Sequence, residues 1–241
     1  MKRLLAGGLG SIYQLGRVFR AGEVGARHEP EFTMLEWYRA FAGATDVMAD
    51  TERLVASVAR AVTGGTVLPG LGGTGAIDVA PPWERLTIRD AFARYASLDA
   101  DALDDERFFL TLTESIEPKL GVERPIFLTE WPARMASLAR LCPHDPTVAE
   151  RFEAFVGGVE LCNGFGELTD PAEQRERLLR DQATRSAMGK EVYPVDERFL
   201  SALAEGMPPS GGNALGVDRL VMLVTGATEI RDVLAFAQDE L

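Results

Sequence analysis

The stretch Arg17-Val18-Phe19-Arg20, followed after a loop by His28-Glu29-Pro30-Glu31-Phe32-Thr33-Met34-Leu35-Glu36-Trp37-Tyr38, combines more charge, aromatic surface and glycine than any other segment of the chain. It predicts two strands, over 12–20 and 32–41, joined by a polar loop that contains glycine. Successive side chains of a strand point to opposite faces, so one face carries Phe32, Met34, Glu36 and Tyr38. A plain antiparallel pair with one solvated face would fit this pattern. The Arg, the His and the two Glu beside apolar strands favour a binding site instead.

Composition limits the class of protein. The 241 residues, 46% of them hydrophobic, suffice for one core and predict a single domain. A net charge of −12 repels nucleic-acid backbones, so tRNA is an unlikely partner and a basic protein surface is favoured. Neither a secretory signal nor a membrane span is expected. Two cysteines without metal-ligand spacing make no disulfide framework, so the sequence predicts a cytoplasmic protein.

A second constellation runs Arg151-Phe152-Glu153-Ala154-Phe155-Val156-Gly157-Gly158-Val159-Glu160-Leu161-Cys162-Asn163-Gly164-Phe165-Gly166-Glu167-Leu168. Gly157-Gly158 predicts a tight turn between two strands, with Phe155 opposite Glu160 and Glu153 opposite Cys162. The two carboxylates are then diagonal neighbours roughly 7–8 Å apart on one face. That arrangement suits Mg²⁺, although two solvated charges on an edge strand would give the same pattern.

A third constellation is Ser210-Gly211-Gly212-Asn213-Ala214-Leu215-Gly216-Val217-Asp218-Arg219-Leu220-Val221-Met222-Leu223. Its glycines permit close approach of the backbone to a ligand. Arg219 begins an apolar helix that would otherwise exclude a charge. It is either a ligand-binding cation or a surface side chain paired with Asp218.

The remaining segments predict scaffold. Helices are expected over 46–63, 87–95, 104–117, 170–189 and 196–205, and a strand over 125–131. The glycine-rich run over 63–75 lacks the lysine of a phosphate-binding loop and predicts a flexible loop. A second loop is expected over 141–146, where His144 would be solvated.

The three constellations resemble motif 2, the Glu-rich substrate segment and motif 3 of lysyl-type class II aminoacyl-tRNA synthetases, and together they span nearly the whole chain. Within this family they are most similar to the short paralogues that ligate (R)-β-lysine to a lysine of elongation factor P. The resemblance implies an α+β fold, with a mostly antiparallel sheet flanked by helices. It also implies a single catalytic domain over 1–241 that lacks the motif 1 region, so the chain is expected to be N-terminally shortened, and to form a homodimer if that region is present.

The resemblance further implies ATP, Mg²⁺, lysine or β-lysine and elongation factor P as cofactors and partners. The catalytic residues would be Arg20 and Arg219, and Mg²⁺ would be held by Glu153 and Glu160. ATP would be bound by Arg20, Ala21, Gly22, Glu23, His28, Glu29, Phe32, Glu160, Leu161, Gly216 and Arg219. The amino acid would be bound by Glu36, Tyr38, Asn163, Phe165, Glu167 and Ala214. Placing Asn163, Phe165 and Glu167 on the face of Glu160 requires a bulge, which we expect near residues 162–164.

Three departures from the family pattern stand out. The family has Glu two places after the Arg of motif 2, whereas this chain has Glu23 three places after Arg20. Asn is common where this chain has Glu29, and Ala214 replaces a glycine of lysyl-tRNA synthetases. Two alternatives to the protein ligase therefore stay open. They are a tRNA-charging catalytic domain, against which Ala214 argues, and a non-catalytic remnant that binds ATP and lysine.

Overall fold

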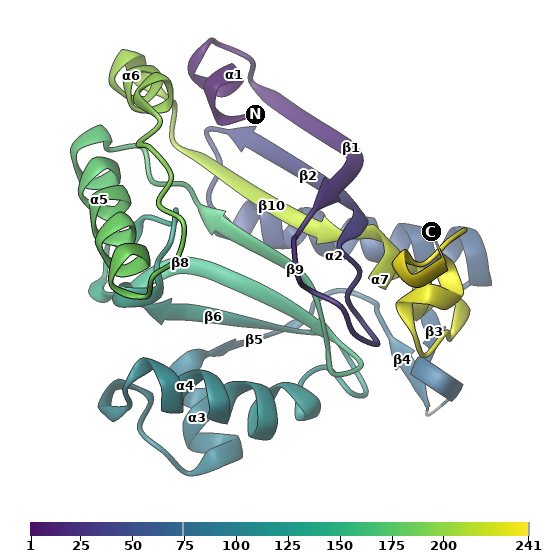
Figure 1. The fold of residues 1–241 in the computed structure, drawn as a ribbon. Helices are drawn as coiled ribbons and strands as arrows, with labels where there is room; N and C mark the ends of the chain where they lie inside the picture. Colours follow the sequence, from purple (N-terminus) through teal and green to yellow (C-terminus); the bar gives the residue numbers. More distant parts are fainter. Residues whose placement is uncertain (74, 241) are drawn as a thin grey trace.

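One large sheet organises the computed structural model, which describes residues 1–73 and 75–240 (Figure 1). Its strands follow the order β1-β2-β10-β9-β8-β6-β5, and β7 pairs with β8. All neighbours are antiparallel except β5 and β6, which confirms the predicted α+β class. The strands are β1 (Ser11–Phe19), β2 (Glu31–Ala40), β5 (Glu84–Thr87), β6 (Ile126–Pro132), β7 (Leu141–Cys142), β8 (Asp145–Val156), β9 (Val159–Gly166) and β10 (Ser210–Gly216).

The helices begin where the capping signals predict them. The side chain of Thr87 accepts from the N–H of Asp90, and Asp170 accepts from the N–H groups of Ala172 and Glu173. The α-helices are α1 (Lys2–Ala6), α2 (Ala44–Thr63), α3 (Ile88–Ala96), α4 (Asp105–Thr111), α5 (Pro171–Ala187), α6 (Glu197–Gly206) and α7 (Val217–Thr225). Among the described residues, none of the helices combines the length and apolar character needed to cross a bilayer.

The helices cover the two faces of the sheet unequally. Helices α2 and α7 pack on one face, where Phe152, Leu215 and Leu223 are buried together. Helices α3 and α4 cover the other face only near β6 and β8, around Leu128 and Phe155. The part of this second face that lies over β2, β10 and β9 is where the side chains of the three constellations meet.

Two local predictions were wrong, and one predicted helix changes its type along its length. The predicted loop over 63–75 contains β3 (Val67–Pro69), a 3₁₀ turn (Leu71–Gly73) and the approach to β4 (Ala76–Asp78). These strands form because Leu68 and Ile77 are buried in the hydrophobic core between α2 and the sheet, called the α2 core below. Thr74 lies outside the described residues. The predicted loop over 141–146 contains β7 and the start of β8. The helix expected over 104–117 ends as an α-helix at Thr111 and continues as a π-helical turn (Leu112–Ile116), ahead of Pro118, which cannot donate a helical hydrogen bond.

Candidate active site

The first constellation forms the predicted hairpin. Val18 pairs with Phe32 and Phe19 with Glu31, and the N–H of Arg20 donates to the carbonyl of Pro30 at 2.8 Å. Beyond this pair the loop closes on itself through Gly25 and His28. The Arg20 guanidinium lies 5.3 Å from the centre of the Phe32 ring and donates to Glu23 at 3.2 Å. Glu23, although displaced by one position in the sequence, thus still contacts the arginine of its motif.

A bulge brings the second constellation onto one face. Gly157 and Gly158 have φ of 63° and 70°, as a tight two-residue turn requires, and Phe155 lies opposite Glu160 as predicted. Glu153, however, lies opposite Asn163, and Cys162 opposite Ala154, so the predicted partner of Glu153 was wrong. The reason is that β9 carries one extra residue, Leu161, just before the expected position of the bulge.

The bulge has a direct consequence for the site. Residues paired across antiparallel strands share a face, and so do residues two apart on one strand. Glu160, Asn163 and Phe165 lie opposite Phe155, Glu153 and Arg151, so all six share one face. On the next strand Ala214 lies opposite Asn163 and Glu36. The residues predicted to bind metal and amino acid therefore do converge on one surface.

Arg219 joins the three constellations. Its guanidinium donates to the carbonyl oxygen of Glu160 at 2.6 Å, contacts the Glu160 carboxylate at 3.3 Å, and lies 2.8 Å from Nε2 of His28. Asp218 is not its partner, because its carboxylate accepts from the N–H of Thr33 at 2.6 Å and fixes α7 to β2. The interpretation of Arg219 as a surface arginine paired with Asp218 was therefore wrong.

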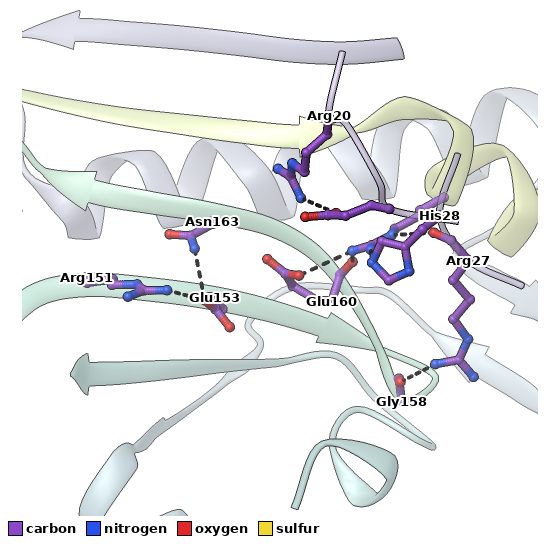
Figure 2. A network of polar contacts seen from close by, with 10 residues as sticks. Arg20, Arg27, His28, Arg151, Glu153, Gly158, Glu160 and Asn163 are labelled. Atoms are coloured by element: carbon purple, nitrogen blue, oxygen red, sulfur yellow. Dashed lines mark hydrogen bonds and ion pairs between the residues drawn. The ribbon is translucent and has the colours of Figure 1, made fainter. Parts of the chain in front are cut away.

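A second contact closes the loop over the site. Arg27 reaches from the β1–β2 loop to the carbonyl of Gly158, 2.9 Å away at the tip of the β8–β9 hairpin. Figure 2 shows Arg20, His28, Glu153 and Glu160 pointing toward the same space between these two hairpins. The loop that carries His28 is thus held on two sides, by Arg27 and by Arg219.

This space is a cavity of about 590 Å³. Most of the predicted ATP-binding and metal-binding residues line it, together with two of the predicted amino-acid contacts. Those lining the cavity are Arg20, Glu23, His28, Glu29, Phe32, Glu153, Glu160, Leu161, Asn163, Ala214, Gly216 and Arg219. The predicted residues that do not line it are Ala21, Gly22, Glu36, Tyr38, Phe165 and Glu167. Glu29 has a further contact, since its carboxylate accepts from the N–H of Gln238 at 3.2 Å.

Glu153 and Glu160 fit the requirements of a Mg²⁺ ion that is shared with phosphates. Burial and the neighbouring Glu160 raise the pKa of the Glu153 carboxyl, and a cation between them would relieve that repulsion. One oxygen of Glu153, Oε1, already accepts from Arg151 at 2.7 Å and from Asn163 at 2.9 Å. No cluster of three acidic, His or Cys side chains able to hold a metal occurs within 1–73 and 75–240. The two carboxylates of Glu153 and Glu160 suit Mg²⁺, which takes one or two carboxylates plus substrate oxygens.

Two of the remaining predicted amino-acid contacts, Tyr38 and Glu167, form a closed end around Gly212, two residues along β10 from Ala214 of the cavity. Glu167 is 1% exposed. Its Oε1 lies so close over Gly212 that a Cβ atom added to this glycine would be 2.4 Å from Oε1. The Tyr38 ring borders the same glycine at 2.5 Å from such an atom. Burial and the nearby carboxylates Glu167 and Glu36 raise the pKa of Tyr38, so its phenol stays a hydrogen-bond donor.

Several cavity residues escaped the sequence analysis. Arg151 and Asp218 stood inside quoted motifs, and their charge next to apolar strands was the available signal. Met34 shares the face of Phe32. The alternation of side chains along the strand predicted which face Met34 lies on, but it gave no role for this residue. Arg27, Phe109 and Ile230 come from a loop, from α4 and from the C-terminal segment, where the sequence offers no signal. The N–H of Ile230 donates to the carbonyl of Ala26 at 2.8 Å, which joins that segment to the hairpin loop.

Comparison with protein families gives one match over nearly the whole chain. The family described as tRNA synthetases class II (D, K and N) matches residues 1–240. This match covers all three constellations and the strands that carry them.

Curated relatives fall into two groups. The lysine–tRNA ligase of Dehalococcoides mccartyi (strain CBDB1) is 42% identical over 259 residues, which cover 98% of this chain and 51% of that protein. The elongation factor P–(R)-beta-lysine ligases of Photorhabdus laumondii and Edwardsiella ictaluri are each 44% identical, over 98% and 99% of this chain and 74% and 75% of theirs. The chain thus spans about half the length of the lysine–tRNA ligases and about three quarters of the protein ligases.

Proposed function

Because this chain belongs to the class II tRNA synthetase family of the D, K and N type, we propose that it activates lysine or (R)-β-lysine with ATP and ligates it to a lysine of elongation factor P. The observation that carries the proposal is the convergence of Arg20, Arg219, Glu153 and Glu160 on one cavity beside a closed, acidic end. Such a site provides cations for a triphosphate and carboxylates for an amine.

The first step would form an adenylate. A carboxylate oxygen of the amino acid attacks the α-phosphorus of ATP, the bond to the β-phosphate oxygen breaks, and pyrophosphate leaves. Arg20 and Arg219 would stabilise the charge that develops on the phosphate oxygens, because an arginine fork donates to two oxygens at once. Mg²⁺ would be held by Glu153 and Glu160, and would supply further charge neutralisation when bound.

The second step would transfer the aminoacyl group. The amine of a protein lysine attacks the adenylate carbonyl, an amide bond forms, AMP leaves and the amine loses a proton. No side-chain nucleophile is required. Glu36, Glu167 and Tyr38 would recognise an amine of the amino-acid substrate, and Phe165 would cover its methylene groups.

Two observations favour a protein acceptor over tRNA. The net charge of −12 opposes tRNA binding. In addition, the aligned length of 259 residues exceeds the 241 of this chain, so the lysine–tRNA ligase carries at least 18 residues within the matched region that have no counterpart here. The alignment with the Photorhabdus laumondii ligase spans 241 residues. Charging of tRNA is the second candidate, supported by the 42% identity to lysine–tRNA ligases.

The test is ATP–pyrophosphate exchange by the purified chain with α-lysine, with (R)-β-lysine and with no amino acid. Exchange that depends on one of the lysines is expected. Transfer of the activated lysine to elongation factor P and to tRNA is then compared in parallel. Preferential charging of tRNA would contradict elongation factor P as the acceptor. Absence of exchange in a folded sample that binds ATP would contradict the proposed activation of lysine.

A further inference from the structure

A lysine of the chain itself lies in the closed end of the site. Nζ of Lys2 is 2.5 Å from Oε2 of Glu167, and the two side chains are 11% and 1% exposed. Lys2 belongs to none of the three constellations, and no role was predicted for it. We propose that Lys2 is a positioning residue, the resident counter-ion that pairs with one oxygen of Glu167 and so tunes this end of the site for a single amine of the substrate. The inference rests on the proposed function.

Helix α1 holds Lys2 in place independently of any ligand. Leu5, one turn further along, is 1% exposed and packs against Leu200, Leu203 and Met207. These residues belong to α6 and to the chain directly after it, so the position of Lys2 is set by a packed helix pair. The Lys2 ammonium therefore belongs to the folded protein and contacts the Glu167 carboxylate without any ligand.

The two oxygens of Glu167 face different groups. Oε2 contacts Lys2, whereas Oε1 lies over Gly212 beside the Tyr38 ring. One oxygen is thus neutralised by the protein, and the other is directed toward Tyr38. A substrate amine that reached Tyr38 would meet an oxygen that Lys2 does not use.

The charges at this end of the site leave one negative charge for the substrate. The titratable groups around Tyr38 are Glu36 and Glu167, and Lys2 is the cation beside Glu167. Two carboxylates and one ammonium leave one negative charge, which matches one protonated amine. Burial raises the pKa of Glu167 and Lys2 acts in the opposite direction, so loss of Lys2 would favour the neutral carboxyl group further. The attraction for the substrate amine would then fall.

The test is steady-state ATP–pyrophosphate exchange by Lys2→Met, Lys2→Arg and wild type, with separate determination of KM for lysine and KM for ATP. We expect Lys2→Met to raise KM for lysine by about tenfold or more, as loss of a charged partner does, and to leave KM for ATP within about twofold. Lys2→Arg keeps the charge and recovers part of the loss. Arg3→Met removes a neighbouring exposed cation of the same helix and is the matched control.

A double variant separates this role from a merely structural one. If Lys2 acts through Glu167, Lys2→Met added to Glu167→Gln raises KM for lysine no further than Glu167→Gln does alone. Lys2→Gln replaces Lys2→Met if the latter does not fold. An unchanged KM for lysine in an active enzyme would overturn the inference and leave the proposed function intact. A lowered KM would also overturn it, because Lys2 would then compete with the substrate. A wild type inactive with every lysine isomer would overturn both.

Discussion

The two ends of the site are built in opposite ways. At the proposed nucleotide end, formed by Arg20, His28, Glu160 and Arg219, side chains line a cavity, and Arg20 is 52% exposed. At the proposed amine end, formed by Lys2, Tyr38 and Glu167, the Glu167 carboxylate is 1% exposed and paired with Lys2. The difference fits the proposed roles: a partly solvated arginine such as Arg20 can still contact phosphate oxygens, whereas selection of one amine depends on buried charges that balance one another.

The largest effect is expected at the nucleotide end. Arg219→Ala removes the side chain that links Glu160, His28 and the β1–β2 loop, and with it the charge that would stabilise the transferring phosphate. Exchange should fall roughly 100-fold to 1,000-fold, as for loss of one transition-state donor.

The matched control is Arg94→Ala, which breaks a solvated ion pair with Glu84, and neither residue lines the cavity. Its exchange rate should equal that of wild type. If Arg219→Ala were to keep wild-type exchange while the control behaves as expected, the nucleotide end would lie elsewhere.

The second effect belongs to the amine end and should appear in KM rather than in the rate at saturating lysine. Glu167→Gln keeps the shape of the side chain but loses its charge. Hydrogen bonds to charged groups are worth about 1.5–3 kcal/mol, so KM for lysine should rise roughly tenfold to 100-fold. KM for ATP should stay at its wild-type value. A parallel rise in both constants would erase the distinction between the two ends.

The sequence predicted which arginine and aromatic side chains line the cavity better than it predicted the surroundings of Glu167, for physical reasons. Arg20, Phe32 and Arg219 stand in local patterns whose strand or helix geometry the neighbouring residues determine. The pair Lys2–Glu167 joins positions far apart in the chain, so no local period could reveal it. The predicted contacts Tyr38 and Glu167 were found near each other, yet they lie outside the cavity.

The register of β8 and β9 shows the same limit within one hairpin. The turn at Gly157-Gly158 follows from sequence, because glycine adopts both positive φ values without strain. The extra residue Leu161 does not, since a bulge depends on packing around it. Leu161 and Cys162 are both buried against the α2 core, although neighbours in a regular strand would point to opposite faces.

The third effect tests the boundary between the two ends. Ala214 lies opposite Glu36 and Asn163 and lines the cavity next to the closed end. Ala214→Gly removes one methyl group and should shift the ratio of kcat/KM for (R)-β-lysine and α-lysine toward α-lysine by about tenfold, the usual worth of one carbon in a pocket. Ala40→Gly, at the end of β2 and outside the cavity, is the control. An unchanged ratio would contradict the expectation that Ala214 determines which lysine isomer is preferred.

The smallest effect concerns a titrating group of the nucleotide end. Burial and the charge of Arg219 lower the pKa of His28 below 6.5, so the folded protein holds His28 neutral where the unfolded chain begins to bind a proton. The free energy of unfolding should therefore fall as pH drops through 6.5 and level off below the pKa of the folded state. His28→Gln lacks this component, so its stability should fall less between pH 7 and pH 5 than that of wild type, measured by urea unfolding. If both profiles ran parallel, burial and the charge of Arg219 would not lower the pKa of His28 in the folded protein. The stability of the protein would then not depend on the protonation of His28 between pH 7 and pH 5.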